Sequence, residues 1–314
     1  MSDRNATLHH RERHNGALVN ERSENMVAFK QVDVFTQRGF FGNPVAVILD
    51  AAGLGDADMQ RIAHWTNLSE TAFVLPAQHP DASYRVRIFT PRQELPFAGH
   101  PSVGSAHAVI EAGMVSVRDG RLIQECGAGL LPVRVEGSDR EQRIFVRSPQ
   151  ARLEPVISKA AAQLATALGA TPHTDHPPQV VNNGPRWWLV DLGTASTVRA
   201  LQPDLADIAA FNRSDASVGV AVFGREPAGS TAALAVRCFC PADGIPEDPV
   251  TGSANACIAA WLAAHEQLPA HEYRASQGRE IGRDGIVTLR VDGRDVWLGG
   301  HSRTIIDGQM LVYE

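Results

Sequence analysis

Apolar and polar residues alternate along several short stretches of the chain, a pattern typical of β-strands that bury one face. In the first half this alternation, together with β-branched runs, predicts strands at 29–35, 45–49, 71–75 and 84–89, with more strand within 122–135. In the second half it predicts strands at 187–191, 218–223, 234–239 and 286–291, and a last strand at the C-terminus. Strands therefore dominate the regular structure of both halves.

Two other segments have the spacing of a helix. Residues 106–110 and 254–262 are rich in alanine, and each follows a turn that contains glycine. Shorter helices are expected after Asp56, which is placed to cap the first of them, and at 204–211. Each half is thus mostly strand around one apolar helix, without the regular strand–helix alternation of a doubly wound sheet. The sequence therefore predicts an α+β fold.

The two halves also repeat a short sequence. The segment Arg87–Pro91 recurs as Arg237–Pro241, 150 residues later, and Gly99-His100 recurs as Gly252-Ser253, 153 residues later. A repeat of this length indicates two similar domains rather than a solenoid. We expect the domains to face each other, so that the starts of the two central helices meet in one cleft. Unpaired N–H groups and partial positive charge at such helix starts favour the binding of a carboxylate.

The length of 314 residues suits two domains, which we place at 27–148 and 149–314. The last strand could cross back and pair with the first domain. Residues 1–26 are polar and charged with little to bury, so we expect a disordered extension there.

Composition and charge exclude several classes of protein. The formal net charge is −6, and no stretch is dense in lysine and arginine, which argues against nucleic-acid binding. No apolar run is long enough to span a bilayer, and residues 1–26 lack the apolar core of a signal peptide. The four cysteines have no Cys-x-x-Cys spacing, so we expect reduced thiols and a cytoplasmic protein.

Five motifs, in order along the chain, resemble those of the phenazine-biosynthesis PhzF family. They are Phe41–Val47, Asn67–Thr71, Arg87–Pro91, Glu94–Pro101 and Glu247–Ala254, with shorter matches at 183–186 and 277–278. The resemblance implies a diaminopimelate-epimerase-like fold, in which two similar domains each curl a mostly antiparallel sheet around a central helix and the active site lies between them. Family members are typically homodimers that need no metal or cofactor, and the best-known member isomerises trans-2,3-dihydro-3-hydroxyanthranilic acid.

Through this resemblance, Glu70 matches the family's acid/base glutamate. A carboxyl group held in an apolar cleft has a raised pKa, so it can take up and return one proton. Trp65, Phe73 and Phe97 are candidate walls for such a cleft, whereas Trp187-Trp188 could be either core or cleft wall. The alternative for Glu70 is a polar residue that pairs at the start of a strand, because most carboxylates are exposed.

The remaining candidate residues lie at the two predicted helix starts. His100 matches a family histidine at the first start, while Asp248 and Ser253 match an aspartate and a serine at the second. The backbone at Gly99 and at Gly252 would let a substrate carboxylate approach the helix N–H groups. The alternative for Asp248 and Ser253 is plain N-capping, and for His100 a hydrogen bond to nearby backbone.

Epimerases and racemases of this fold use two facing thiols, one at each central helix, and here the two helix starts carry no sulfur. The four cysteines, at positions 126, 238, 240 and 257, fit better as small buried apolar residues. The leading hypothesis is therefore a cofactor-independent isomerase in which one glutamate moves a proton within a small cyclic or unsaturated carboxylate. A lyase or dehydratase using the same glutamate, or a catalytically silent carboxylate-binding protein, stays open as an alternative.

Overall fold

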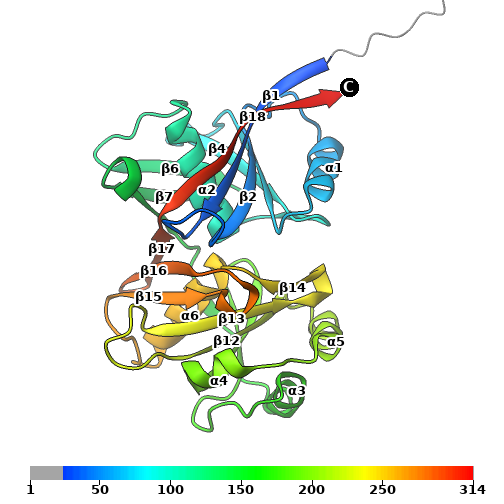
Figure 1. Ribbon diagram of the computed structural model, residues 1–314, viewed down its shortest axis with the longest axis vertical. Helices are drawn as coiled ribbons and strands as arrows, with labels where there is room; N and C mark the ends of the chain where they lie inside the picture. Colours follow the sequence, from blue (N-terminus) through cyan, green and yellow to red (C-terminus); the bar gives the residue numbers. More distant parts are fainter. Residues whose placement is uncertain (1–23, 314) are drawn as a thin grey trace, which may run out of the picture.

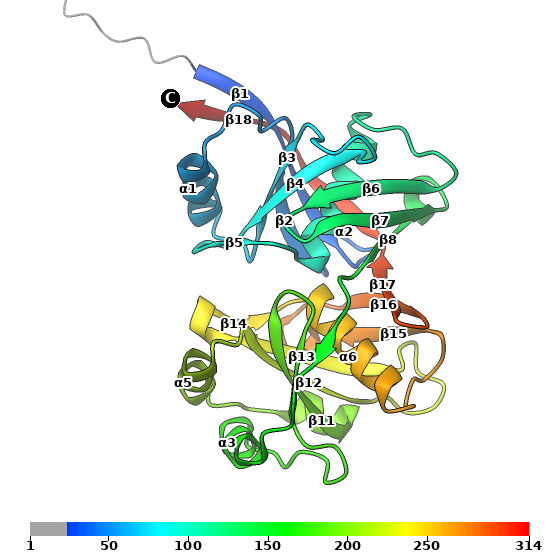
Figure 2. The ribbon, with the colours of Figure 1, turned by 180° about the vertical axis from the view of Figure 1, so that it is seen from behind.

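The computed structural model describes residues 24–313, and Figure 1 shows two bodies stacked along the long axis of the molecule. We call the body around the first central helix the N-terminal lobe (residues 24–147 and 302–313) and the other body the C-terminal lobe (148–301). Seen from behind, the lobes join where β8 (Arg143–Arg147) meets β17 (Asp295–Gly300), and these two strands pair antiparallel (Figure 2).

The helices and strands of the N-terminal lobe are β1 (Glu24–Val34), β2 (Asn43–Ile48), α1 (Asp56–Thr66), β3 (Thr71–Leu75), β4 (Tyr84–Phe89), β5 (Glu94–Leu95), α2 (Gly99–Glu111), β6 (Arg121–Cys126), β7 (Gly129–Glu136), β8 and β18 (Ser302–Tyr313). Those of the C-terminal lobe are β9 (Arg152–Leu153), α3 (Ser158–Leu168), β10 (Gln179–Asn182), β11 (Arg186–Thr194), α4 (Ala195–Ala200), α5 (Leu205–Asp215), β12 (Gly219–Arg225), β13 (Leu234–Cys240), β14 (Ile245–Asp248), α6 (Gly252–Ala264), β15 (Glu272–Gln277), β16 (Gly285–Asp292) and β17.

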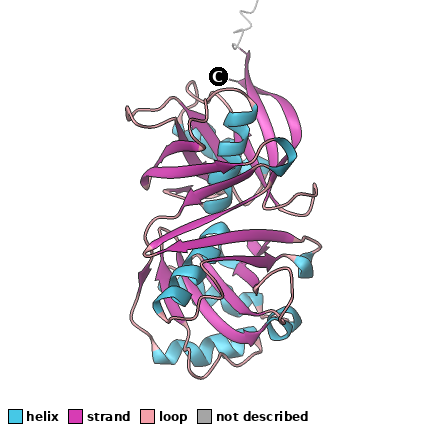
Figure 3. Cartoon of the chain, turned by 90° about the vertical axis from the view of Figure 1, so that its left-hand side faces the viewer, coloured by secondary structure: helices cyan, strands magenta, loops and turns pink. Residues whose placement is uncertain are grey.

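Strand pairing follows the same order in the two lobes. In the N-terminal lobe β2–β3 is parallel, β3–β4 antiparallel and β4–β6 parallel. In the C-terminal lobe β11–β12 is parallel, β12–β13 antiparallel and β13–β15 parallel. All other strand pairs in the described range are antiparallel, and Figure 3 shows a helix enclosed by the strands of each lobe. The predicted α+β fold, with a mostly antiparallel sheet around a central helix in each half, is confirmed.

The repeated segment forms the same local structure twice. Arg87 on β4 donates from Nε to Glu94 on β5 at 2.7 Å, and Arg237 on β13 donates from Nε to Glu247 on β14 at 2.9 Å. Each guanidinium also lies 5.1 Å from the centre of the phenylalanine ring two residues further along the chain. The two hairpins that lead into the central helices are therefore built alike.

The central helices α2 and α6 are enclosed rather than amphipathic. Ten of the thirteen residues of each helix are buried, which explains why both segments are rich in alanine and nearly free of charge. Small side chains let a sheet curl closely around a helix. Among the described helices, none combines the length and apolar character needed to cross a membrane.

The last strand returns to the N-terminal lobe. β18 pairs with β1 along its whole length, from Glu24 opposite Tyr313 to Val34 opposite Ser302. This pairing corrects two expectations, namely that the disordered extension reaches residue 26 and that the first strand begins at Phe29. Residues 24–26 belong to β1 because the C-terminal residues supply their hydrogen-bonding partner, and residues 1–23 of the expected extension lie outside the described range.

The shorter helices differ in part from the prediction. Asp56 is the first residue of α1 rather than its cap, because Gly55 occupies the cap position and Asp56 instead accepts a hydrogen bond from Arg87 at 2.6 Å. Asp204 does cap α5, accepting from the backbone N–H groups of residues 206 and 207. Helices α3 and α4 were not predicted.

Candidate active site

The starts of the two central helices meet at the junction of the lobes. A Cβ atom built on Gly99 would lie 2.8 Å from Gly252 Cα, and one built on Gly252 would lie 2.9 Å from Gly99 Cα. Such distances are below normal van der Waals contact, so only glycine permits this approach. The prediction that the two helix starts face each other is confirmed by this geometry.

Neither helix start is capped by a side chain. Ala98 precedes α2 and Thr251 precedes α6, and in neither case does the cap side chain accept a helix N–H. The capping alternative for Asp248 and Ser253 is therefore wrong. Both helices instead direct uncapped N–H groups toward one shared space, which is the arrangement that favours an anion.

A small cavity of about 40 Å³ lies between these helix starts. It is lined by all six residues predicted for the site, namely Glu70, Gly99, His100, Asp248, Gly252 and Ser253. Ligand pockets usually measure about 300–1,000 Å³. A cavity of this size holds about one water molecule, so a ring-containing acid would need the cavity to widen.

Glu70 lies just before β3 and points into this cavity. Its side chain is 16% exposed, while Oε2 is buried and has no hydrogen-bond partner among the described residues. Burial, which is the largest cause, and the nearby carboxylates of Asp248 and Asp243 together raise the pKa of Glu70 to about 8, and a hydrogen bond with Ser69 opposes the shift. Glu70 is therefore mostly protonated at neutral pH.

His100 faces Glu70, with 3.6 Å between His100 Nε2 and Glu70 Oε2. Burial lowers the pKa of His100 to about 3, so the imidazole is neutral. The Asn43 amide lies 3.4 Å from His100 Nδ1, but it donates its two hydrogens to Asp248 Oδ1 at 3.0 Å and to the Val250 carbonyl at 2.9 Å. A hydrogen bond with the Pro44 backbone opposes this lowering of the His100 pKa. His100 Nε2 has no hydrogen-bond partner among the described residues and faces Glu70.

Asp248 is held by a buried hydrogen-bond network. Its Oδ2 accepts from the Thr251 hydroxyl at 2.5 Å and its Oδ1 from Asn43. Gln277 supports the same turn, donating from Nε2 to the Asp248 carbonyl and to Thr251 Oγ1 at 2.9 Å each. Burial is the largest cause of the raised pKa of Asp248, and the hydrogen bonds from Thr251 and Asn43 oppose it. Each carboxylate oxygen keeps a lone pair for a further donor.

Ser253 is oriented by two partners from the C-terminal lobe. Trp187 Nε1 donates to Ser253 Oγ at 3.2 Å, and Asn183 Nδ2 donates to the Ser253 carbonyl at 3.1 Å. The Ser253 hydroxyl hydrogen thus remains available for a ligand. Trp187, which the sequence left open between core and cleft wall, lines the cavity.

The three other residues that were predicted as cleft walls do not line the cavity, so this prediction is wrong. Trp65 is 79% exposed on α1, whereas Phe73 and Phe97 are fully buried in the core and do not line the cavity. Along β3 the side chain of Phe73 lies on the face opposite to Glu70, because side chains alternate along a strand. Phe73 packs edge-on against Phe89 instead.

Several lining or supporting residues were missed, and four of them bear on the chemistry of the cavity. Asn43 holds Asp248 from across the lobe junction, and Asp243 lines the cavity with a pKa raised by burial. Thr90 and Cys240 occupy equivalent places in the repeat and line the cavity together. Cys240 is therefore a cavity wall as well as a buried apolar residue. Burial raises the pKa of its thiol well above the ordinary value, so the thiol stays protonated. The repeat itself was the signal that could have placed Thr90 and Cys240.

The other cysteines agree with the expectation of small apolar residues. Cys238 and Cys257 are buried, Cys126 is half-buried, and all four thiols are free. Within residues 24–313, no three or more histidine, cysteine, aspartate or glutamate side chains are grouped so as to hold a metal ion.

Comparison with known proteins places this geometry in a family. The sequence profile described as phenazine biosynthesis-like protein matches residues 32–309. The chain is 35% identical over 295 residues to antisense-enhancing sequence 1 of Schizosaccharomyces pombe, covering 91% of this chain and 99% of that protein. It is 38% identical over 267 residues to the trans-2,3-dihydro-3-hydroxyanthranilate isomerase of Pseudomonas aeruginosa, covering 83% and 89%. A crystal structure of a PhzF-family protein of Bacillus anthracis matches with a TM-score of 0.79 at 26% identity, covering 92% and 100%.

Proposed function

The chain belongs to the phenazine biosynthesis-like, or PhzF, family of isomerases, and we propose that Glu70 moves one proton between two carbon atoms of a small cyclic or unsaturated carboxylate. The observation that carries this proposal is the position of Glu70. An unpartnered, buried carboxyl oxygen lies in the same cavity as two uncapped helix starts. A proton carrier and an anion-binding site therefore adjoin each other.

The proposed reaction needs no group beyond the substrate and this carboxyl. The ionised form of Glu70 takes a proton from one carbon, and the electron pair of the broken C–H bond delocalises through the unsaturated system toward the substrate carboxylate. The resulting carboxylic acid returns the proton to another carbon of the same molecule. Because burial raises the pKa of Glu70 to about 8, the carboxylate is a stronger base than an exposed glutamate.

The surrounding groups would stabilise the delocalised negative charge. The N–H groups at the starts of α2 and α6 and the Ser253 hydroxyl would bind the substrate carboxylate, into which the charge develops. Neutral His100 would accept a hydrogen bond at Nε2 from the substrate or from protonated Glu70, without adding a positive charge. Asp248, fixed by Asn43 and Thr251, would accept a hydrogen bond from a substrate hydroxyl or amine.

The substrate named for the Pseudomonas aeruginosa relative, trans-2,3-dihydro-3-hydroxyanthranilate, is the first candidate to test. Turnover is followed in deuterium oxide by NMR and mass spectrometry for the native protein and for Glu70→Gln. From the native protein we expect an isomer of unchanged skeleton in which solvent deuterium replaces only part of the transferred hydrogen, and for the variant a loss of at least about 1,000-fold in rate. Glu141→Gln, at an exposed glutamate, is the matched control and should turn over at the native rate.

The same experiment separates the alternatives. A product lighter by one water molecule would identify a dehydratase, and binding without any turnover would identify a carboxylate-binding protein. Native turnover by Glu70→Gln would refute the proposed role of Glu70.

We also propose that the protein acts as a cytoplasmic homodimer without metal or cofactor, as the family resemblance implies. The four free thiols support a reducing compartment. Light scattering coupled to size-exclusion chromatography should give twice the mass of the chain, and a monomer mass would contradict the proposed dimer.

A further inference from the structure

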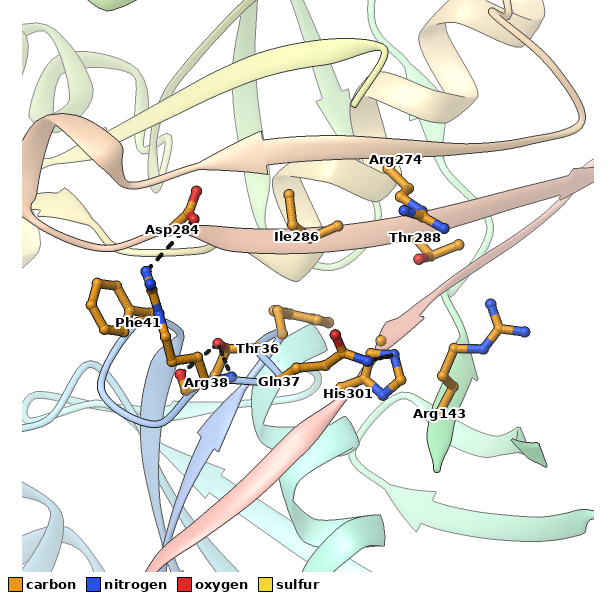
Figure 4. A pocket seen from close by; sticks show the side chains of 12 residues that line it. Thr36, Gln37, Arg38, Phe41, Arg143, Arg274, Asp284, Ile286, Thr288 and His301 are labelled. Carbon is orange, nitrogen blue, oxygen red and sulfur yellow. Dashed lines mark hydrogen bonds and ion pairs between the residues drawn. The ribbon is translucent and has the colours of Figure 1, made fainter. Parts of the chain in front are cut away.

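A second and larger cavity lies at the lobe junction and shares no lining residue with the candidate active site. Its volume is about 320 Å³, within the range of about 300–1,000 Å³ that small-molecule pockets occupy. Figure 4 shows that the loop after β1 and residue His301 form its lower wall, while β15 and β16 of the C-terminal lobe form its upper wall. A ligand in this cavity would therefore touch both lobes.

One end of the cavity is rich in hydrogen-bond donors with positive charge. Arg274 on β15 and Thr288 on β16 are directly paired across the two strands, and Arg143 reaches toward them from β8 (Figure 4). Arg143 forms ion pairs with Glu136 at 3.0 Å and with Glu272 at 3.7 Å, which balance its charge. Arg274 is exposed and takes part in none of the described ion pairs. This end of the cavity thus carries one guanidinium whose charge no described residue balances.

The other groups at this end are neutral donors and acceptors. His301 Nδ1 bonds the carbonyl of Gln142 at 3.1 Å, and its Nε2 lies 3.1 Å from the Gln37 amide nitrogen. Burial lowers the pKa of His301, so the ring adds no second free positive charge. At the far end, Arg38 lies over the Phe41 ring and pairs with Asp284 at 3.8 Å, so its charge is compensated.

Apolar surface continues from the Arg274 end into the cavity. Phe35 and Ile286 line this part, and Phe41 lines the far end. A ligand that fits both parts carries a negatively charged group and a small apolar body. Guanidinium groups recognise carboxylate and phosphate with paired hydrogen bonds, so either group suits the charged end.

The lower wall of this cavity leads directly to the candidate active site. The backbone N–H of Asp284 donates to the Phe41 carbonyl at 2.8 Å, and that of Ile286 donates to the Phe35 carbonyl at 2.9 Å. Two residues after Phe41, Asn43 holds Asp248 across the junction. Anything that clamps this loop onto β16 therefore favours the lobe arrangement in which Asn43 reaches Asp248.

We propose that this cavity binds a small organic anion, a carboxylate or a phosphate ester, between Arg274 and the loop at 35–41, and that the bound anion stabilises the lobe arrangement in which Asn43 reaches Asp248. Such a ligand would act by binding this lobe arrangement more tightly than any other, so it would regulate the active site and would not be a substrate.

Binding is tested by calorimetry on the whole protein with benzoate and with inorganic phosphate as probes. We expect saturable binding that weakens about tenfold or more in Arg274→Gln, because one charge-assisted hydrogen-bond pair is lost. Arg213→Gln, at an exposed arginine on α5, is the matched control and should bind as the native protein does. Stronger binding of benzoate would assign a carboxylate ligand, and stronger binding of phosphate a phosphate ester.

The effect on the lobes is tested by hydrogen exchange, which needs no substrate. With the anion bound, exchange at residues 36–42 and at the helix starts near 99–100 and 252–253 should slow about fivefold in the native protein and remain unchanged in Arg274→Gln. Equal binding by Arg274→Gln and the native protein would place the anion elsewhere, such as at the helix starts, and overturn the proposal. Binding at Arg274 without slower exchange at the helix starts would overturn it as well.

Discussion

Replacing Glu70 by glutamine should stabilise the protein, and the gain should depend on pH. Burial and the charge of Asp248 raise the pKa of Glu70 from 4.5 to about 8. The unfolded chain releases this proton near pH 4.5, whereas the folded protein holds it until about pH 8. Ionisation therefore favours the unfolded state between these two values, and glutamine, which has the same shape and no charge, removes that cost.

The magnitude follows from the shift. Below pH 4.5 the carboxyl is protonated in both states and the native protein incurs no cost. Between pH 4.5 and about 8, the native free energy of unfolding falls by about 1.4 kcal/mol for each pH unit relative to the variant. By pH 7 this amounts to about 3 kcal/mol, and at pH 8 and above it levels off at about 5 kcal/mol.

The assay is urea unfolding of the native protein and Glu70→Gln at several pH values from 4.5 to 9. Their difference in unfolding free energy should rise with the stated slope and reach a plateau near pH 8. Glu141→Gln corrects for the loss of one negative charge from the surface. A difference that does not change with pH, or that levels off below pH 6, would show that Glu70 is solvated and refute the reasoning.

Three further predictions concern the lobe junction. Gly252→Ala should lower kcat/KM about 100-fold, because the new Cβ would push against Gly99 and separate the helix starts. Gly104→Ala is the control: it crowds the core and should lower the urea unfolding free energy by about 1–3 kcal/mol without that loss of activity. Asn43→Ala leaves two buried acceptors unpaired and should lower the urea unfolding free energy by about 3 kcal/mol; an unchanged value would refute the contact. In a pH–rate profile, kcat/KM should rise about tenfold per pH unit up to about pH 8, where Glu70 is ionised, and a plateau beginning near pH 5 would contradict this.

The repeat in the sequence predicted the central feature of the fold. Two similar segments, each ending in a glycine before an alanine-rich run, indicated two helix starts in one cleft, and Gly99 and Gly252 do meet there. The motifs also named Glu70, His100 and Asp248, which line one cavity, and their roles stay predictions. These features were visible because a duplicated unit repeats its local pattern at a fixed distance along the chain.

Contacts between the lobes were not visible in the same way. Asn43 bonds Asp248, 205 residues away, and no local pattern marks such a pair. Trp65 and Phe73 were wrongly predicted as cleft walls, because Trp65 lies on the exposed face of its helix and Phe73 on the buried face of its strand. The start of β1 was placed too late because its partner, β18, comes from the other end of the chain.

The most direct test of a single proton carrier is to follow the hydrogen itself. A substrate deuterated at the carbon that loses its proton is turned over in ordinary water, and the product is examined by NMR at the carbon that gains one. A buried monoprotic carboxyl at position 70 exchanges slowly with solvent, so a measurable fraction of the product should carry the original deuterium. Complete washout of the label, together with native turnover by Glu70→Gln, would contradict the account.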